Sequence, residues 1–291
     1  MRDLKAGVPI RMLIAPAAFA VFNDFSHVLG YLRSLGVEAF YPVLPYADIT
    51  VWAYYKILKA NPRAKLICSA CIGMNGYLER DESYAGYLCP VFSPLLCAAR
   101  YLKTYRHLEG RFAFLSPCLL KKNEFAVHHQ EQLVRYNITI DALKTWLDAE
   151  SVDIRRYEPC VEETGENGKG LTLAAFGGIG KVLSALLPDT WFHAEEGLGN
   201  AATYLSTSRE FREPRDHACV FEPYACRGGC AHGSGVGANP VREDTDFLKC
   251  GAEADTARIF KLFAHYDTTL KLRDFCHPDS RGFGEHLQFF A

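Results

Sequence analysis

Short apolar segments alternate with amphipathic helical segments along the chain, and this order limits the fold more than any other feature. Segments typical of buried strands lie at residues 8–14, 39–41, 65–69 and 111–116. Helical segments lie at residues 24–35, 95–105 and 140–149, and another starts at Asp48 or Thr50 and ends before Asn61. We expect Asp24 to cap the first helix and Thr139 to cap the last. Strands and helices that alternate in this way form a parallel sheet covered by helices on both faces, so the sequence predicts an α/β fold.

The second half of the chain continues this pattern after a polar segment at residues 162–169. We expect a strand at 171–176, a helix at 178–187, a strand at 220–223 and an amphipathic helix at 254–267. The apolar side of that last helix would carry Ile259, Phe260, Leu262 and Phe263. We predict a single domain over residues 1–291, with lobes at about 1–160 and 170–291 between which the chain can cross. Each lobe would contain a mainly parallel sheet flanked by helices.

Charge and composition exclude several classes of function. With 32 Lys and Arg against 34 Asp and Glu, the net charge is −2, which does not favour binding to nucleic acid. No segment approaches the roughly 20 apolar residues of a membrane span. Residues 8–22 are similar to the apolar part of a signal peptide, but Arg11 and Pro16 interrupt them. We therefore expect a cytoplasmic protein with neither a nucleic-acid partner nor a membrane span.

The chain has 11 cysteines, an odd number with irregular spacing, which favours metal binding or thiol chemistry over a disulfide framework. Three groups follow predicted strands: Cys68 with Cys71, Cys118, and Cys226 with Cys230. Ligands gather at the carboxyl ends of strands in α/β sheets, so thiolates from these loops could surround one iron–sulfur cluster. A zinc site made of Cys68, Cys71, Cys226 and Cys230 stays open as an alternative, although it leaves Cys118 unexplained.

The remaining cysteines have simpler interpretations. We interpret Cys97, Cys160 and Cys219 as small buried apolar residues. Cys250 and Cys276 are expected to be thiols near the surface, and His128 and His129 a solvated pair.

Together the three cysteine segments resemble the signature loops of the catalytic domain of iron-only (FeFe) hydrogenases. Pro117, Cys118, Lys121 and Glu124 match the family's Pro-Cys-x-x-Lys-x-x-Glu loop. Residues 225–230 match its Ala-Cys-Pro-Gly-Gly-Cys loop except at Arg227, and residues 68–72 stand where the family has Thr-Ser-Cys-Cys-Pro. Weaker similarities occur in the same order at residues 15–17, 47–50, 93–94 and 176–178.

The resemblance implies the H-cluster, a 4Fe–4S cluster joined to a two-iron subsite that carries CO, cyanide and an azadithiolate. By this resemblance Cys71, Cys118, Cys226 and Cys230 bind the 4Fe–4S cluster in a cleft between the lobes, and Cys230 also bridges to the two-iron subsite. Lys121 would donate a hydrogen bond to one cyanide. Further contacts to the cofactor are expected from Pro16, Ala17, Ser93, Pro94, Ser116, Pro117, Glu124, Tyr224, Gly228 and Gly229.

The chain departs from the family where active members carry protons to the two-iron subsite. Ala70 replaces the first cysteine of that relay, residues 53–57 contain no carboxylate, and Cys89 stands where the family has a serine. Ser116 and Tyr224 replace two methionines. These changes are similar to the sensory branch of the family, which keeps the cofactor, turns over slowly and is linked to regulation. We therefore expect a hydrogenase-type oxidoreductase of low activity that senses hydrogen in an anaerobe. Cys68 and Cys89 would offer a substitute proton route, unless Cys68 is only a buried residue at a strand end.

The same resemblance sets the expected partners. Dihydrogen and protons would be the substrates, and maturation proteins would supply the two-iron subsite. No segment similar to a ferredoxin precedes Val8 in this sequence, so we expect an external electron donor or a fused redox or signalling domain. The alternative is a homologue that keeps only an iron–sulfur cluster and acts as a binding or cluster-assembly protein, although the N-terminal cysteine motif of such homologues is missing.

Overall fold

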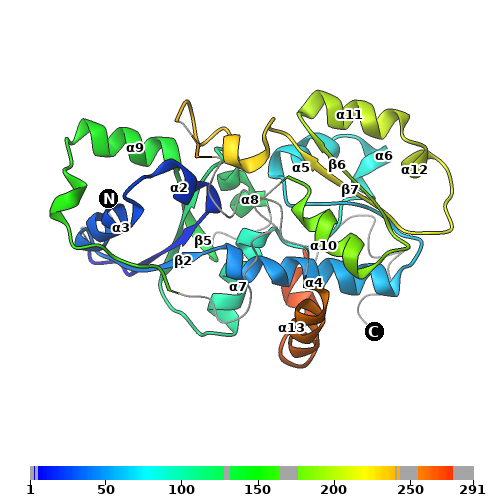
Figure 1. Ribbon diagram of the computed structural model, residues 1–291, viewed down its shortest axis with the longest axis horizontal. Helices are drawn as coiled ribbons and strands as arrows, with labels where there is room; N and C mark the ends of the chain where they lie inside the picture. The colour runs from blue at the N-terminus through cyan, green and yellow to red at the C-terminus, as the bar shows by residue number, and fades with distance from the viewer. Residues whose placement is uncertain are drawn as a thin grey trace.

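The computed structural model describes residues 3, 6–127, 132–163, 176–239, 241–242 and 255–277, and it contains two parallel β-sheets flanked by helices (Figure 1). The first sheet has the strand order β2 (Val37–Pro42), β1 (Ile10–Ile14), β4 (Arg111–Ser116) and β5 (Val134–Thr139). The second has the order β3 (Lys65–Ile67), β7 (Cys219–Tyr224) and β6 (Trp191–Glu196). All pairings between these seven described strands are parallel, which confirms the predicted α/β architecture.

Helices cover both faces of the first sheet because its buried strands present apolar side chains alternately to the two sides. Ile10, Met12 and Ile14 of β1 pack against α2 (Pro16–Val21), α3 (Phe25–Ser34) and α9 (Ile140–Ala149). Leu13 of β1 and Phe114 of β4 point to the opposite side, into the largest cluster of buried residues.

That largest cluster joins the two sheets. Its centre is α4 (Leu44–Ala60), which packs along α7 (Pro94–Thr104) and against α10 (Gly178–Leu186), and whose Trp52 and Tyr54 are fully buried. Figure 1 shows α4 running across the middle of the molecule, from beside the first sheet to below the second. The far face of the second sheet is covered by α5 (Ile72–Leu78) and α11 (Leu198–Thr207).

The other elements are short or peripheral. They are α6 (Glu82–Ala85), α8 (Lys121–Val127), α12 (Arg209–Arg212), α13 (Thr256–Thr269) and the 3-10 helices η1 (Ile154–Arg156), η3 (Gly229–His232) and η4 (Leu272–Phe275). Helix α13 projects from the body of the molecule in Figure 1 and buries Phe263 and Tyr266, whereas Phe260, predicted on its apolar side, is 44% exposed. No helix among the described residues is long and apolar enough to cross a membrane.

Two details of the sequence interpretation are wrong. Helix α4 starts at Leu44 and not at Asp48 or Thr50, because Pro45 fits the first turn of a helix, where no backbone N–H is needed. Asp24 precedes α3 but makes no capping hydrogen bond and pairs with Arg155 instead. The strand expected at 171–176 lies outside the described residues except for its last position.

Strands β5 and β6 were not predicted, and both lie at the edges of their sheets. An edge strand is less completely covered, so it can keep polar residues such as Arg135 and Asn137 in β5, or His193 and Glu195 in β6. Their apolar pattern is correspondingly weak.

Thr139 links a strand end to a helix start and generates a prediction about stability. Its Oγ1 accepts a hydrogen bond from the Ala142 amide at 3.2 Å, as expected for the cap of α9. Thr139→Ala should lower the free energy of unfolding by about 1 kcal/mol in chemical denaturation. Thr139→Ser keeps the hydroxyl and serves as the control, and equal loss in both variants would contradict a capping role.

Candidate functional site

Three cysteine loops follow the carboxyl ends of β3, β4 and β7 and meet between the two sheets. The Ala225 amide donates a hydrogen bond to Cys71 Sγ at 3.5 Å, which joins the first loop to the third. The Gly235 amide donates to the Pro117 carbonyl at 2.7 Å and the Leu119 amide to Ser234 Oγ at 3.1 Å, which joins the third loop to the second. The structure therefore brings together the three segments that the spacing of cysteines singled out.

Glycines allow the second and third loops to approach this closely. A Cβ atom on Gly233 would lie 2.3 Å from the Pro117 carbonyl oxygen, and one on Gly235 would lie 2.7 Å from the Cys118 amide nitrogen. Gly228 and Gly229 adopt φ of +75° and +64°, in the left-handed region that side chains disfavour. Only glycine at these positions permits the observed turn between Cys226 and Cys230.

The four proposed cluster ligands are close enough to influence one another electrostatically. Burial raises the pKa of Cys226, and Cys71 and Cys118 raise it further. Burial, followed by the nearby Cys71, raises the pKa of Cys230 to about 12, although Lys121 acts in the opposite direction. Four crowded thiolates repel one another, so they need a cationic group such as an iron–sulfur cluster to be stable together. Among the described residues, no three His, Cys, Asp or Glu side chains are grouped to hold a single metal ion.

A cavity of about 150 Å³ adjoins these cysteines. Cys71, Cys118 and Cys230 form part of its wall, and Cys230 is the exposed one of the three. Of the residues predicted to contact the cofactor, it is lined by Pro16, Ala17, Pro94, Pro117, Lys121 and Tyr224. The donor set and this adjoining space fit a 4Fe–4S cluster with a second group next to Cys230.

Lys121 is held at the cavity wall by Glu124. Its Nζ lies 2.6 Å from Glu124 Oε2 and donates to the Ala70 carbonyl at 3.3 Å, and Glu124 is only 2% exposed. Burial acts to lower the pKa of Lys121, but the Glu124 carboxylate and the nearby Cys118 and Cys230 outweigh it and raise the pKa overall. Lys121 therefore stays protonated and presents a positive charge to the cavity.

Several residues that we predicted to contact the cofactor do not line the cavity and instead take part in hydrogen bonds that stabilise the loops and the start of α7. Ser93 Oγ accepts a hydrogen bond from the Leu96 amide at 3.4 Å and caps α7. Ser116 Oγ accepts from the Cys118 amide and donates to the Cys118 carbonyl, both at 3.1 Å, so its hydroxyl stabilises the loop. The Gly228 amide donates to Glu196 Oε2 at 2.8 Å.

Cys68 and Cys89 differ in their relation to the cavity. Cys68 lines it and is 1% exposed, and Ala70 beside it has no proton to exchange. Cys89 is also buried but is not part of the wall. Between them lies Tyr54, whose hydroxyl accepts a hydrogen bond from the Ser69 amide at 2.9 Å and whose pKa is raised well above normal by burial and by both cysteines.

Glu222 is a cavity residue that the sequence interpretation missed. It lies in β7, is 3% exposed and lines the same cavity. Its carboxylate accepts hydrogen bonds from the Gly180 amide at 2.8 Å, the Ile179 amide at 3.4 Å and the Tyr224 hydroxyl. Burial raises the pKa of Glu222, and these donors lower it in part. The available signal was a single carboxylate inside an otherwise apolar buried strand.

The other cysteines follow the interpretation in part. Cys97 and Cys219 are fully buried, as predicted. Cys160 is only half-buried, where its sulfur accepts a hydrogen bond from Arg33. Cys276 is 4% exposed and not a surface thiol, because η4 carries it into the core beside Val91. Cys250, His128 and His129 lie outside the described residues.

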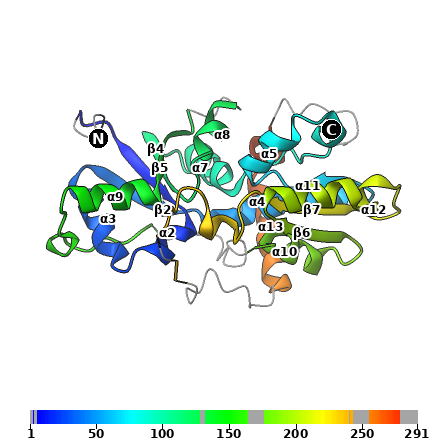
Figure 2. The ribbon, with the colours of Figure 1, turned by 90° about the horizontal axis from the view of Figure 1, so that it is seen from above.

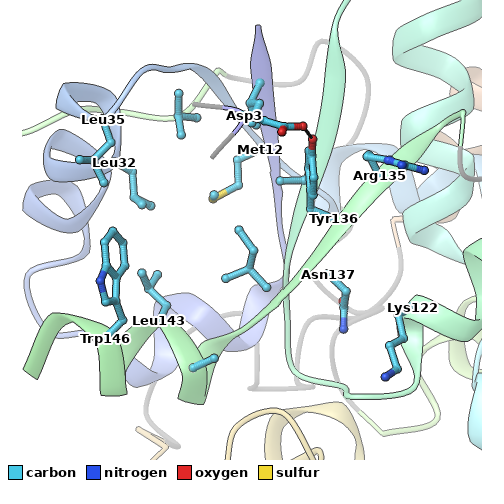
Figure 3. A pocket seen from close by; sticks show the side chains of 15 residues that line it. Asp3, Met12, Leu32, Leu35, Lys122, Arg135, Tyr136, Asn137, Leu143 and Trp146 are labelled. Atoms are coloured by element: carbon cyan, nitrogen blue, oxygen red, sulfur yellow. Dashed lines mark hydrogen bonds between the residues drawn. The ribbon is translucent and has the colours of Figure 1, made fainter. Parts of the chain in front are cut away.

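A larger cavity of about 680 Å³, with no cysteine among its lining residues, lies between α3, α9 and the first sheet (Figure 3). Apolar side chains such as Met12, Leu32, Leu143 and Trp146 dominate its wall, and Asp3 and Tyr136 form a hydrogen bond at one side. A group bound by cysteines would therefore lie at the smaller cavity and not here.

Comparisons with known proteins agree with this geometry. Residues 9–234 match the family of the iron-only hydrogenase large subunit, C-terminal domain. Among curated protein sequences, none matches the chain.

Solved structures of FeFe-hydrogenases share the fold. Two variants of the Chlamydomonas reinhardtii enzyme, one of them in its apo form, are each 17% identical, with TM-scores of 0.58 for the apo form and 0.59 for the other. Each match covers 96% of this chain and 92% of the algal one. A FeFe-hydrogenase with an H cluster that includes a 2Fe subcluster is 16% identical, with a TM-score of 0.59 over 94% of this chain and 88% of that one. Since the family match spans most of the sequence and includes all three cysteine loops, the chain belongs to the family of the iron-only hydrogenase large subunit, C-terminal domain.

Proposed function

We propose that the chain binds an H-cluster and reacts slowly and reversibly with dihydrogen, and that it serves in hydrogen sensing. The observation that carries this proposal is that Cys71, Cys118 and Cys230, from three strand ends, line one small cavity with a buried lysine, while Cys226 lies in the same loop as Cys230. Membership of the hydrogenase family supports an oxidoreductase activity.

In this proposal Cys71, Cys118, Cys226 and Cys230 hold the 4Fe–4S cluster, and a two-iron group next to Cys230 supplies the heterolytic splitting of dihydrogen. Lys121 has three N–H donors, of which Glu124 and the Ala70 carbonyl take two. The third is available for an anionic ligand in the cavity. Pro16 and Ala17 form an apolar wall that excludes water and strengthens this interaction.

Proton exchange limits the proposed activity. Ala70 lines the cavity without a transferable proton, so the group nearest the cofactor in active relatives is absent. We assign Cys68 as the first carrier, since its thiol lies in the wall, with Cys89 behind Tyr54 as a second buried thiol. Both cysteines have pKa values raised by burial, which makes them slow proton donors at neutral pH.

The proposed partners follow from the chemistry. Splitting dihydrogen releases protons and electrons, and the electrons pass to an external carrier or to a fused redox or signalling domain. The two-iron group needs maturation proteins, and we propose that the chain works in the cytoplasm of an anaerobe.

Reconstitution tests the proposed cofactor. The chain is loaded anaerobically with iron and sulfide, then with a synthetic two-iron complex carrying CO and cyanide, and its infrared spectrum is recorded. We expect bound CO and cyanide bands that shift under dihydrogen, because the cavity beside Cys230 accepts the complex. An iron–sulfur cluster without these bands would instead support a cluster-binding or assembly role, and zinc without iron would support a structural zinc site.

The contact between the second and third loops predicts a specific loss of iron. A methyl group on Gly235 would meet the backbone of Pro117 and Cys118 at less than normal contact distance, so Gly235→Ala should separate the loops and prevent cluster assembly. Iron and sulfide bound per chain after reconstitution provide the measurement. Gly76→Ala is the control, because its added Cβ meets nothing within 4 Å. Equal iron content in both variants would contradict the required loop contact.

The assignment of Cys68 predicts slower proton exchange in its absence. Cys68→Ala should reduce dihydrogen turnover by the loaded protein and alter its pH dependence, because the wall loses its thiol. Cys97→Ala removes an equally buried thiol outside the cavity and should leave both unchanged. Unaltered turnover and pH dependence in Cys68→Ala would reject this carrier.

A further inference from the structure

The cavity wall contains few groups able to replace the missing proton relay. Its titratable side chains are Cys68, Cys71, Cys118, Lys121, Glu222, Tyr224 and Cys230. The cluster ligands Cys71, Cys118 and Cys230 are committed to iron in the proposed function, and Lys121 is fixed as a cation by Glu124. Cys68, Glu222 and Tyr224 remain.

Glu222 is held in a setting that makes both of its protonation states accessible. The amides of Ile179 and Gly180 at the start of α10 and the Tyr224 hydroxyl stabilise the carboxylate, whereas burial stabilises the neutral acid. No Lys, Arg or His among the described residues forms an ion pair with it, so no cation fixes it in the charged state. A carboxyl group balanced in this way is suited to acid–base exchange.

The strand register places Glu222 beside Cys68. In the parallel pair β3–β7, Leu66 lies opposite Val220 and Ile67 opposite Phe221, and the Cys68 amide donates to the Phe221 carbonyl at 2.8 Å. Cys68 and Glu222 are the next two residues, on strands that are about 4.8 Å apart. Their side chains point to the same side of the sheet, as those of Leu66 and Val220 do, and both reach the cavity wall. Burial and then the charge of Glu222 raise the pKa of Cys68, as expected for groups that are neighbours in this register.

We propose that Glu222 exchanges protons with Cys68 in place of the missing relay. When a proton leaves the cavity, the S–H bond of Cys68 breaks as an O–H bond forms on Glu222, and the Cys68 thiolate takes up the proton from the cavity side. Glu222 returns to the carboxylate when its O–H bond breaks and its proton passes to a water molecule that reaches it. The reverse sequence delivers a proton. The Tyr224 hydroxyl positions the carboxyl group for this exchange. This inference rests on the proposed function, because only dihydrogen chemistry requires protons in this cavity.

The first test follows the carboxyl group in the protein without the two-iron complex. Infrared difference spectra between wild type and Glu222→Gln should contain the C=O stretch of a buried, protonated carboxyl group, which disappears as the pH rises through the pKa of Glu222. Tyr224→Phe removes a donor to the carboxylate and should move this transition to higher pH. Absence of the band at every pH, or no shift in Tyr224→Phe, would overturn the inference without loading any cofactor.

The pH dependence of thermal stability provides a second measurement of the titration of Glu222. The pKa of Glu222 is raised in the folded state, so its ionisation disfavours folding, and wild type should lose thermal stability relative to Glu222→Gln as the pH rises through that pKa. The Ile179 and Gly180 amides donate to different oxygens of Glu222, so the single oxygen of glutamine keeps one of these two hydrogen bonds, and circular dichroism checks that the variant folds. A constant difference in melting temperature across the pH range would contradict the assigned titration.

The second test uses the loaded protein and the exchange of dihydrogen with deuterated solvent. Glu222→Gln should keep the CO and cyanide bands but exchange roughly 10²-fold more slowly, the usual effect of removing a general acid–base group. Glu195→Gln, on the neighbouring strand β6, should exchange at the wild-type rate. Normal bands with unchanged exchange in Glu222→Gln would overturn this inference and leave the proposed function intact. Loss of the bands in wild type would count against the proposed function, while the cofactor-free titration still decides the state of Glu222.

Discussion

The close contact between the Pro117–Cys118 turn and Gly233 and Gly235 is the constraint on which the site depends. The second and third cysteine loops leave different sheets, and a side chain at either glycine would push their backbones apart. Because the Gly235 amide donates a hydrogen bond to the Pro117 carbonyl, the contact also fixes the position of one loop relative to the other. Figure 2 views the same junction from above, with η3 near the middle of the molecule and α8 and α5 above it. The way in which the two sheets are joined therefore determines where the cysteines of the two loops lie relative to each other, and so which group they can bind.

The shared core explains why this junction is rigid. Helix α4 packs against α7 on one side and α10 on the other, and β3 belongs to the second sheet although it lies between β2 and β4 in sequence. Neither sheet can therefore move without disturbing buried side chains of the shared core, such as Trp52 and Tyr54 of α4. A closely packed interior resists such shifts, so the walls of the cavity, including Lys121 and Glu222, are held in place before any ligand enters.

Elements that are defined by residues near in sequence could be predicted, whereas those that depend on residues distant in sequence could not. The bounds of β4 and α9 are predicted correctly because an apolar run and the Thr139 cap define them within a few residues. Edge strands β5 and β6 escape prediction because neighbouring strands, and not their own polar sequences, determine their pairing. Cys276 is predicted at the surface because its burial depends on η4 reaching a core built from residues far away in sequence. Glu222 is missed for the same reason, since only the β3–β7 register and the start of α10 give its carboxylate neighbours.

Burial at this site stabilises the ion pair of Lys121 but makes ionisation of the proposed proton carriers unfavourable. The same low polarity that strengthens the Lys121–Glu124 pair raises the pKa values of Cys68 and Glu222, so the charged forms of both proposed carriers are costly. Each proton that moves between them must pass through one of these charged forms, which makes the proposed transfer slow. A route through solvated carboxylates would be faster, but residues 53–57 provide none. A protein that detects dihydrogen benefits from this limit, because slow turnover lets the state of the cofactor follow the gas concentration without consuming the gas.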